Sequence, residues 1–245
     1  MNRLDRLQRF YELLDQLSDQ LGGPRTLDEF SNYRDWPARG VYFFFEPGEA
    51  RSDSGEGLRV VRVGTHALTS GSRSTLRQRL SQHRGTRSGG GNHRGSIFRL
   101  LVGQALIAQG TVSNCKSWGV KGSKGDAVRS MGIDRQVLEA AEAPVERAVS
   151  DHIGRMPFLW LSINDEPGSA SLRGLIERNS IALLTNQSDG ALDSPSSDWL
   201  GLHSNRSAVV RSGLWNQRHT DEHYDPAFLD EFSRLIELTK SPDLQ

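Results

Sequence analysis

The sequence has little cysteine, no long apolar run and a long stretch without acidic residues. Cys115 is the only cysteine among 245 residues, which excludes an intrachain disulfide framework and a cysteine-based zinc site. No run of about 18 apolar residues is present, which argues against a membrane-spanning helix. The first residues are charged and follow a helical pattern rather than that of a secretory signal. We therefore expect a cytoplasmic protein without a membrane partner.

Acidic residues are absent from Gly57 to Gly125. These 69 residues contain nine arginines and three lysines, although the whole chain has a net charge of zero. Neutralising phosphates releases their bound counterions, so a basic segment in a neutral protein is typical of a surface that binds nucleic acid. The alternative is a solvated basic surface that binds nothing.

Hydrophobic patterning predicts an α/β fold with a small, largely antiparallel sheet of three strands flanked by helices. The strands are expected over 40–45, 58–63 and 157–163, and the first two form a hairpin across a polar loop. Helical spacing of apolar residues predicts helices over 3–21, 75–83, 96–109, 134–153, 169–184 and 225–238. A kink or break is expected at Pro144, and Ser72 or Ser74 is expected to cap the second helix. The segments 85–95 and 114–125 are expected to be loops.

These elements predict a single domain over residues 1–245. Its parts are a helical appendage over 1–35, a core over 40–186 and a C-terminal extension over 187–245. The N-terminal helix is expected to pack on the core, with pairing to a partner as the alternative. Residues 196–224 are rich in tryptophan, arginine and histidine. Trp199 and Trp215 fit positions in the core. The basic residues of the segment fit contacts with substrate: Arg206, Arg211, His219 and His223.

Short motifs follow one another in order along the predicted core. Gly40-Val41-Tyr42 begins the first strand, and Arg62-Val63-Gly64 ends the second. A helix then carries Arg79 with His83 four residues later. A later helix carries Glu177, and Asn186 follows nine residues after it. Over residues 40–186 this order resembles the GIY-YIG nuclease superfamily, in the restriction-enzyme-like subgroup with an Arg-x3-His motif.

The resemblance implies a metal-dependent endonuclease that hydrolyses DNA phosphodiester bonds with one Mg²⁺ or Mn²⁺ ion. Glu177 would hold the metal, and the catalytic residues would be Tyr42, Arg79, His83 and Asn186. In the family a second tyrosine usually helps to place or activate the attacking water, and Arg62 stands in its place here. We therefore consider His66, just beyond the second strand, as a substitute base, with contact to phosphate or solvent as the alternative.

The residue types suit the cleavage of a phosphodiester bond. Arg79 and His83 are four residues apart on a helix and share a face, and a planar guanidinium can hold a phosphate oxygen. Mg²⁺ keeps several of its waters, so one carboxylate such as Glu177 can suffice. A cation from Arg62 could help Tyr42 to act as a base. The structural alternatives are a surface arginine, a histidine at a helix end, a core tyrosine and a glutamate engaged in a salt bridge.

The expected partner is DNA, taken as double-stranded. Glycines at 89–91 leave backbone N–H groups free to approach phosphates, with a floppy linker as the alternative. The predicted DNA-binding residues are Arg62, Arg77, Arg84, His93, Arg94 and Arg99. A homodimer would supply two sites for cutting both strands. One rival hypothesis is a nucleic-acid-binding protein that kept the fold but lost catalysis, and another is an interaction module that uses the N-terminal helix.

Overall fold

A three-stranded antiparallel sheet in the order β2-β1-β3 forms the centre of the computed structural model, which describes residues 1–29, 36–187 and 190–239. The strands are β1 (Gly40–Ala50), β2 (Leu58–Gly64) and β3 (Phe158–Ser162). The α/β fold and the three strands expected from the sequence are confirmed. β1 is longer than predicted because it continues to Ala50, with irregular pairing to β2 after Phe44.

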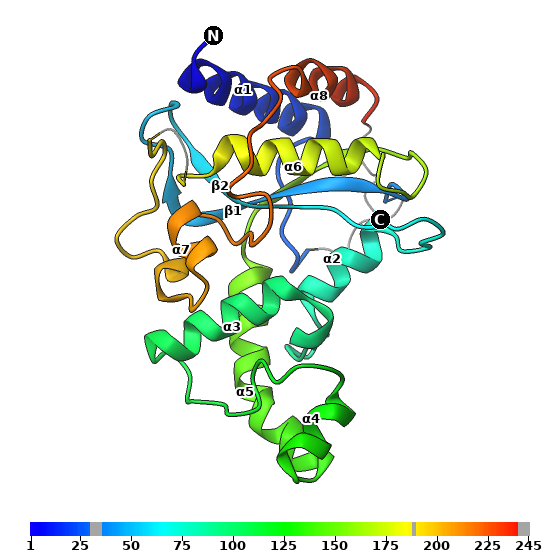
Figure 1. Cartoon of the computed structure of the whole chain (residues 1–245), viewed down its shortest axis with the longest axis vertical. Helices are drawn as coiled ribbons and strands as arrows, with labels where there is room; N and C mark the ends of the chain where they lie inside the picture. Colours follow the sequence, from blue (N-terminus) through cyan, green and yellow to red (C-terminus); the bar gives the residue numbers. More distant parts are fainter. Residues whose placement is uncertain (30–35, 188–189, 240–245) are drawn as a thin grey trace.

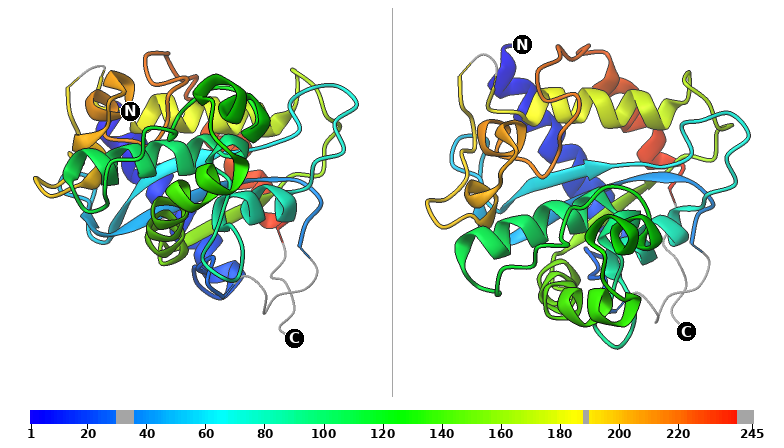
Figure 2. Two further views of the ribbon diagram at one scale, coloured as in Figure 1. Left: turned by 90° about the horizontal axis from the view of Figure 1, so that it is seen from below. Right: turned by 60° about the horizontal axis from the view of Figure 1, so that its bottom comes forward.

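Helices cover both faces of the sheet (Figure 1). On one face lie α1 (Arg3–Leu21), α6 (Leu172–Leu184) and α8 (Phe228–Glu237). On the other face lie α2 (Leu76–Arg84), α3 (Ile97–Gln109) and α5 (Arg135–Gly154). In the right-hand view of Figure 2, α6 lies above the sheet and α3 lies below it. α4 (Lys124–Met131) lies beside one end of α5, away from the sheet, and α7 (Ser207–Ser212) belongs to the C-terminal segment.

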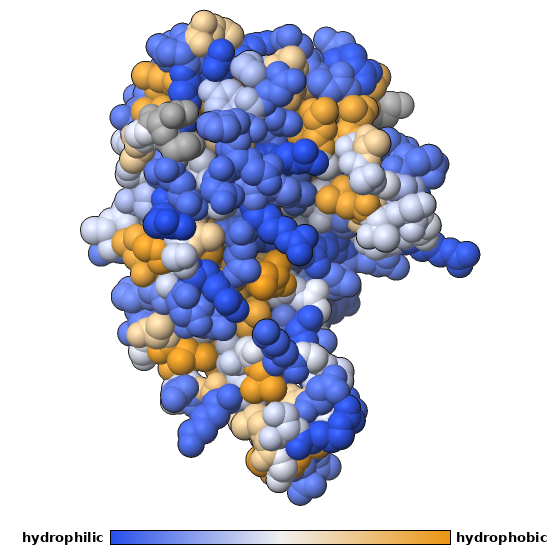
Figure 3. Space-filling view, in the orientation of Figure 1, coloured by the Kyte–Doolittle hydropathy of each residue, from blue (hydrophilic) through white to orange (hydrophobic). Residues whose placement is uncertain are grey.

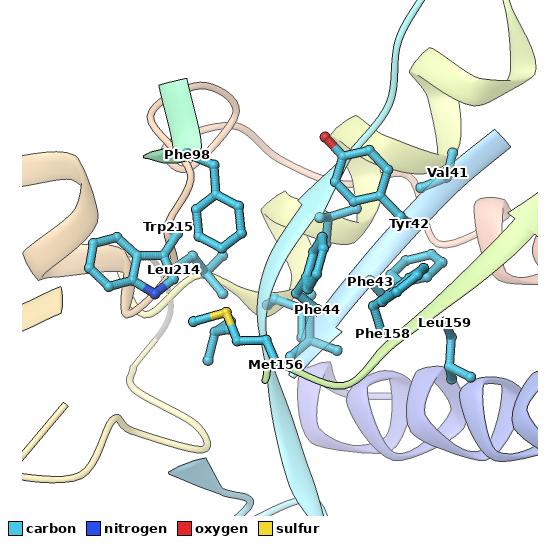
Figure 4. Packing of buried hydrophobic residues seen from close by; sticks show 14 of the residues in the cluster. Val41, Tyr42, Phe43, Phe44, Phe98, Met156, Phe158, Leu159, Leu214 and Trp215 are labelled. Carbon is cyan, nitrogen blue, oxygen red and sulfur yellow. The ribbon is translucent and has the colours of Figure 1, made fainter. Parts of the chain in front are cut away.

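Alternating side chains of β1 divide the core between the two helical layers. The Phe43 ring lies 5.9 Å from Phe10 in α1 and 5.5 Å from Phe232 in α8. Phe44 points the other way, toward Phe98 in α3 (Figure 4). The centres of these two rings are 5.5 Å apart. Tyr42 is two residues before Phe44 and therefore shares the face covered by α2 and α3.

Local details differ from the sequence predictions. Thr75 caps α2 through a capping box with Gln78, so neither Ser72 nor Ser74 is the cap. The break that was one of the two expectations at Pro144 does not occur, because α5 continues through this residue, and Leu138 before it and Val145 after it are buried and hold both halves in place. The short elements α4, α7, η2 (His93–Gly95) and η3 (Leu200–His203) were not predicted.

Segments distant in sequence cover both edges of the sheet. Along β2, the Trp215 N–H donates to the Val61 carbonyl at 2.7 Å. The Asn216 side chain accepts from the Val63 N–H at 3.1 Å and donates to the Val63 carbonyl at 2.8 Å. Along β3, Arg25 and Phe158 exchange two backbone hydrogen bonds. Residues 215–219 are thereby held beside the end of β2.

The surface seen in Figure 3 is hydrophilic over much of its area, with apolar residues in separate patches. Within the three described ranges, no helix is long and apolar enough to cross a membrane.

Candidate active site

One cavity of about 530 Å³ lies where β1, β2, α2 and α6 meet. Residues 215–219 of the C-terminal segment form part of its wall. The residues predicted from the sequence that line it are Tyr42, Arg62, His66, Arg79 and Glu177. The fold therefore brings together side chains that are spread over more than a hundred positions of the chain.

Tyr42 is buried at the cavity and is held by His83 from α2. The Tyr42 hydroxyl lies 2.8 Å from His83 Nε2, and His83 Nδ1 lies 2.8 Å from Ser96 Oγ. Burial lowers the pKa of His83 well below its ordinary value, and the charges of Arg79 and Arg62 act in the same direction. His83 is therefore a neutral imidazole, able to exchange a proton with Tyr42. It does not line the cavity itself, so it can act only through the tyrosine.

Gly64 leaves the space that the Tyr42 ring occupies. The two residues pair across β1 and β2, and a Cβ atom at Gly64 would lie 2.4 Å from the Tyr42 hydroxyl oxygen. Any side chain here would displace the ring. The glycine of the Arg62-Val63-Gly64 motif is thus required for the position of Tyr42.

Gly64→Ala should lower the free energy of unfolding by about 1–3 kcal/mol, because the added methyl group forces the Tyr42 ring to move. Urea unfolding measures this loss. Gly125→Ala is the matched control, since a Cβ atom there meets no atom closer than 3.6 Å and alanine favours the helix α4. That control should gain about 0.5–1 kcal/mol. An unchanged unfolding free energy for Gly64→Ala would show that Tyr42 is not tightly held against β2.

Arg79 is half-buried and points from α2 to the cavity. Its guanidinium donates to the Gln82 side chain at 3.0 Å and to the Gly95 carbonyl at 3.3 Å. Among the described residues its Nε has no hydrogen-bond partner. Donors therefore remain for an oxygen-rich anion such as a phosphate.

Glu177 is the carboxylate of the cavity. Its Oε1 accepts the Thr65 N–H at 3.1 Å. The salt bridge considered for it is not formed, because Arg173 pairs with Asp165 and Arg178 lies 3.9 Å from Glu222. Burial raises the pKa of the Glu177 carboxyl, and the charges of Arg62 and His219 partly oppose that rise.

These residues fit a single hard cation. The Glu177 carboxylate lines the cavity, and carboxylate oxygens are among the ligands that Mg²⁺ and Mn²⁺ prefer. The part of the chain that the structure describes contains no group of three or more His, Cys, Asp or Glu side chains that could hold a metal. The site therefore suits an ion that keeps most of its water ligands.

His66 presents a proton acceptor to the cavity. Its Nδ1 lies 3.1 Å from the Ser74 carbonyl oxygen, which can only accept, so Nδ1 carries the proton and Nε2 the lone pair. Nε2 is buried and has no partner among the residues described. Burial lowers the pKa of His66 to about 4, and the charge of Arg173 acts in the same direction.

A comparison with protein families matches residues 1–242 to the GIY-YIG domain. The chain belongs to the GIY-YIG domain family. This match extends over nearly the whole chain and confirms the resemblance read from the short motifs, so the protein is a member of a nuclease family. No curated protein and no solved structure matches it.

His66 should make the stability of this GIY-YIG protein depend on pH. In the unfolded chain His66 gains a proton below about pH 6.5, whereas the folded protein keeps it neutral down to about 4. Its contribution to stability is therefore complete above the unfolded pKa and is lost as the pH falls toward 4, at up to about 1.4 kcal/mol per pH unit. His66→Asn should flatten this slope in urea unfolding. Equal slopes in both proteins would contradict the lowered pKa.

Three of the predicted DNA contacts bond to glutamates of α5 and tie the α3 region to that helix. Arg99 is fully buried, and its Nε and Nη2 donate to Glu146 Oε2 at 3.0 and 2.5 Å. His93 Nδ1 lies 3.0 Å from Glu146 Oε1, and Arg94 donates to both oxygens of Glu142 at 2.8 Å. We therefore leave Arg99, His93 and Arg94 out of the proposed DNA-binding surface. Arg77 is exposed on α2 and Arg84 is half-buried near its end, so both stay in it.

Asn186 does not line the cavity. Its Oδ1 accepts from the Leu192 N–H at 3.0 Å, and its own N–H donates to the Ser212 carbonyl, so it orders the C-terminal segment. Asn216 lines the cavity instead, fixed to the edge of β2. No sequence signal distinguishes Asn216 from the other polar residues around it.

The sequence leaves two interpretations open for the tryptophans and histidines of residues 196–224, and the structure places them as follows. Trp199 and Trp215 are buried, which agrees with the prediction that they occupy core positions. Both indole N–H groups donate to Glu46. His219 lines the cavity, and its Nδ1 lies 2.7 Å from Glu222 Oε1. Its φ of +64° lies in the left-handed region, which is uncommon for a residue other than glycine.

Proposed function

We propose that this GIY-YIG protein is a metal-dependent endonuclease that hydrolyses the phosphodiester bonds of DNA. The observation that supports it best is the single cavity shared by Tyr42, Arg79 and Glu177, with the tyrosine bonded to the neutral His83. A proton acceptor, a cation and a carboxylate are the groups that phosphodiester hydrolysis requires.

Each side chain has a distinct task in this proposal. Glu177 would hold Mg²⁺ or Mn²⁺, and such an ion would supply positive charge for a phosphoryl oxygen and for the attacking water. Arg79 binds a non-bridging phosphate oxygen and stabilises the negative charge that develops there. The attacking water gives a proton to the Tyr42 oxygen as Tyr42 gives its own proton to His83 Nε2 across their 2.8 Å contact. The resulting hydroxide forms the new bond to phosphorus, the P–O bond to the leaving oxygen breaks, and solvent water protonates that oxygen. His66 Nε2 is the second candidate acceptor of the water proton.

A non-catalytic DNA-binding protein on the same fold is the second candidate. The replacement of the family's second tyrosine by Arg62 favours it, since a group that places or activates water is missing. This candidate predicts salt-sensitive DNA binding without any metal-dependent cleavage.

Supercoiled plasmid, incubated with the purified protein and Mg²⁺ or Mn²⁺, distinguishes the two candidates. We expect conversion to nicked circles that stops when a chelator removes the metal. DNA binding without nicking under both metals would contradict the endonuclease proposal. The order of products also reports on assembly, because a dimer that cuts both strands in one encounter yields linear DNA without a nicked intermediate.

A further inference from the structure

Arg62 differs from the other arginines in the interior. Four arginines are buried among the described residues. Three of them pair with a carboxylate: Arg59 with Glu49, Arg99 with Glu146 and Arg173 with Asp165. Arg62 has no described carboxylate within the 4.0 Å of an ion pair. A buried cation without a counterion is unfavourable, and such a charge is retained where something else binds it.

The contacts of Arg62 fix its orientation but use few of its donors. Nη1 donates to the Trp215 carbonyl, and the guanidinium lies 4.8 Å from the centre of the Phe98 ring. The Tyr42 hydroxyl and, beyond ion-pair distance, the Glu177 carboxylate also interact with it. Nε has no hydrogen-bond partner in the described part of the chain. A guanidinium has five N–H donors and keeps its charge at any ordinary pH. The donors that Arg62 does not use could therefore bind an acceptor with several oxygens.

The cavity as a whole carries an excess of positive charge. Arg62, Arg79 and Arg218 line it together with a single carboxylate, Glu177. The lowered pKa of His66 keeps that histidine neutral, so it does not change this balance at neutral pH. An entering anion would therefore meet two guanidinium groups, one from β2 and one from α2.

We propose that Arg62 is a phosphate-binding residue and that its missing counterion is a phosphodiester of the substrate. The inference rests on the proposed function for the identity of the anion as DNA. The planar guanidinium fork matches two phosphate oxygens, and Arg79 holds the same group from the other side. Arg62, at the position of the family's second tyrosine, thus binds the substrate in this protein. Tyr42 and the histidines place and deprotonate the attacking water.

Calorimetric titration of inorganic phosphate into the metal-free protein tests this role. Arg62→Met should weaken phosphate binding about ten- to hundredfold, the range expected for a charge-assisted hydrogen bond. Arg129→Met is the matched control, because Arg129 is exposed on α4 and does not line the cavity, and this variant should bind phosphate as the wild type does. Thermal unfolding shows whether each variant is folded. Arg62→Gln, which keeps a donor for the Trp215 carbonyl, replaces the methionine variant if that one does not fold.

Unchanged phosphate affinity in the folded Arg62 variant would overturn the proposal. The cation would then serve the neighbouring Tyr42 oxygen, and the pH profile of nicking would shift while phosphate binding stayed constant. The titration involves no cleavage, so its failure is separable from that of the proposed function. Phosphate binding that depends on Arg62 in a protein that never nicks DNA would remove the endonuclease proposal alone.

Discussion

Glu177→Gln should reduce metal-dependent nicking by about a thousandfold, on the scale of losing a group that stabilises the transition state. Glutamine has the shape of glutamate and keeps an oxygen for the Thr65 N–H, but it has no charge with which to hold a divalent cation. Burial raises the pKa of Glu177, so its charged form is disfavoured in the folded protein. The neutral variant should therefore be at least as stable as the wild type near neutral pH.

Two measurements compare Glu177→Gln with the wild type. Initial nicking rates at saturating Mg²⁺ give the effect on catalysis, and urea unfolding gives the effect on stability. Glu237→Gln is the control, because this exposed carboxylate ends α8 and does not line the cavity. A wild-type nicking rate in Glu177→Gln would remove Glu177 from the metal site, whatever the control shows.

Arg99→Met should lower the free energy of unfolding by about 3–5 kcal/mol, the largest stability loss that we expect from one substitution here. The guanidinium of Arg99 binds the Glu146 carboxylate through Nε and Nη2 and also donates to the His83 and Glu146 carbonyls. Methionine fills similar space but leaves the carboxylate buried with only His93 for a partner. The loss comes from this stranded charge rather than from the ion pair itself.

Arg87→Met serves as its control, because Arg87 is an exposed arginine in the loop after α2. It should change stability by less than about 0.5 kcal/mol. A loss below about 1 kcal/mol for Arg99→Met would show that the pair behaves like an exposed ion pair, and Arg99 would return to the set of candidate DNA contacts.

The long elements of the fold could be predicted from the sequence because their periodicity is clear. The pattern of α1 over residues 3–21 and the aromatic strand that begins at Gly40 each bury one consistent side. α4 and α7 escaped prediction because elements of eight and six residues contain too few turns for a period to show. The cap of α2 was misplaced because Ser72, Ser74 and Thr75 all have the chemistry of a cap, and only the backbone conformation selects Thr75.

The candidate site was predictable as far as motif order could position it. The spacing from Gly40-Val41-Tyr42 to Glu177 was sufficient to select residues that meet at one cavity. It was not sufficient to show which basic residues are internal, because Arg99 is neutralised by Glu146, forty-seven positions away. Nor could it show that Asn216, rather than Asn186, lines the cavity, since that depends on a hydrogen bond to the edge of β2.

The contacts along the two outer strands have a consequence for how copies of the protein behave toward one another. An uncovered edge strand offers a row of N–H and C=O groups with which a second chain can pair and aggregate. Here Trp215 and Asn216 occupy the groups of Val61 and Val63, and Arg25 occupies those of Phe158. The segment that completes the wall of the cavity therefore also guards the sheet against strand addition. Substitutions that detach residues 215–219 from β2 should therefore reduce solubility as well as function.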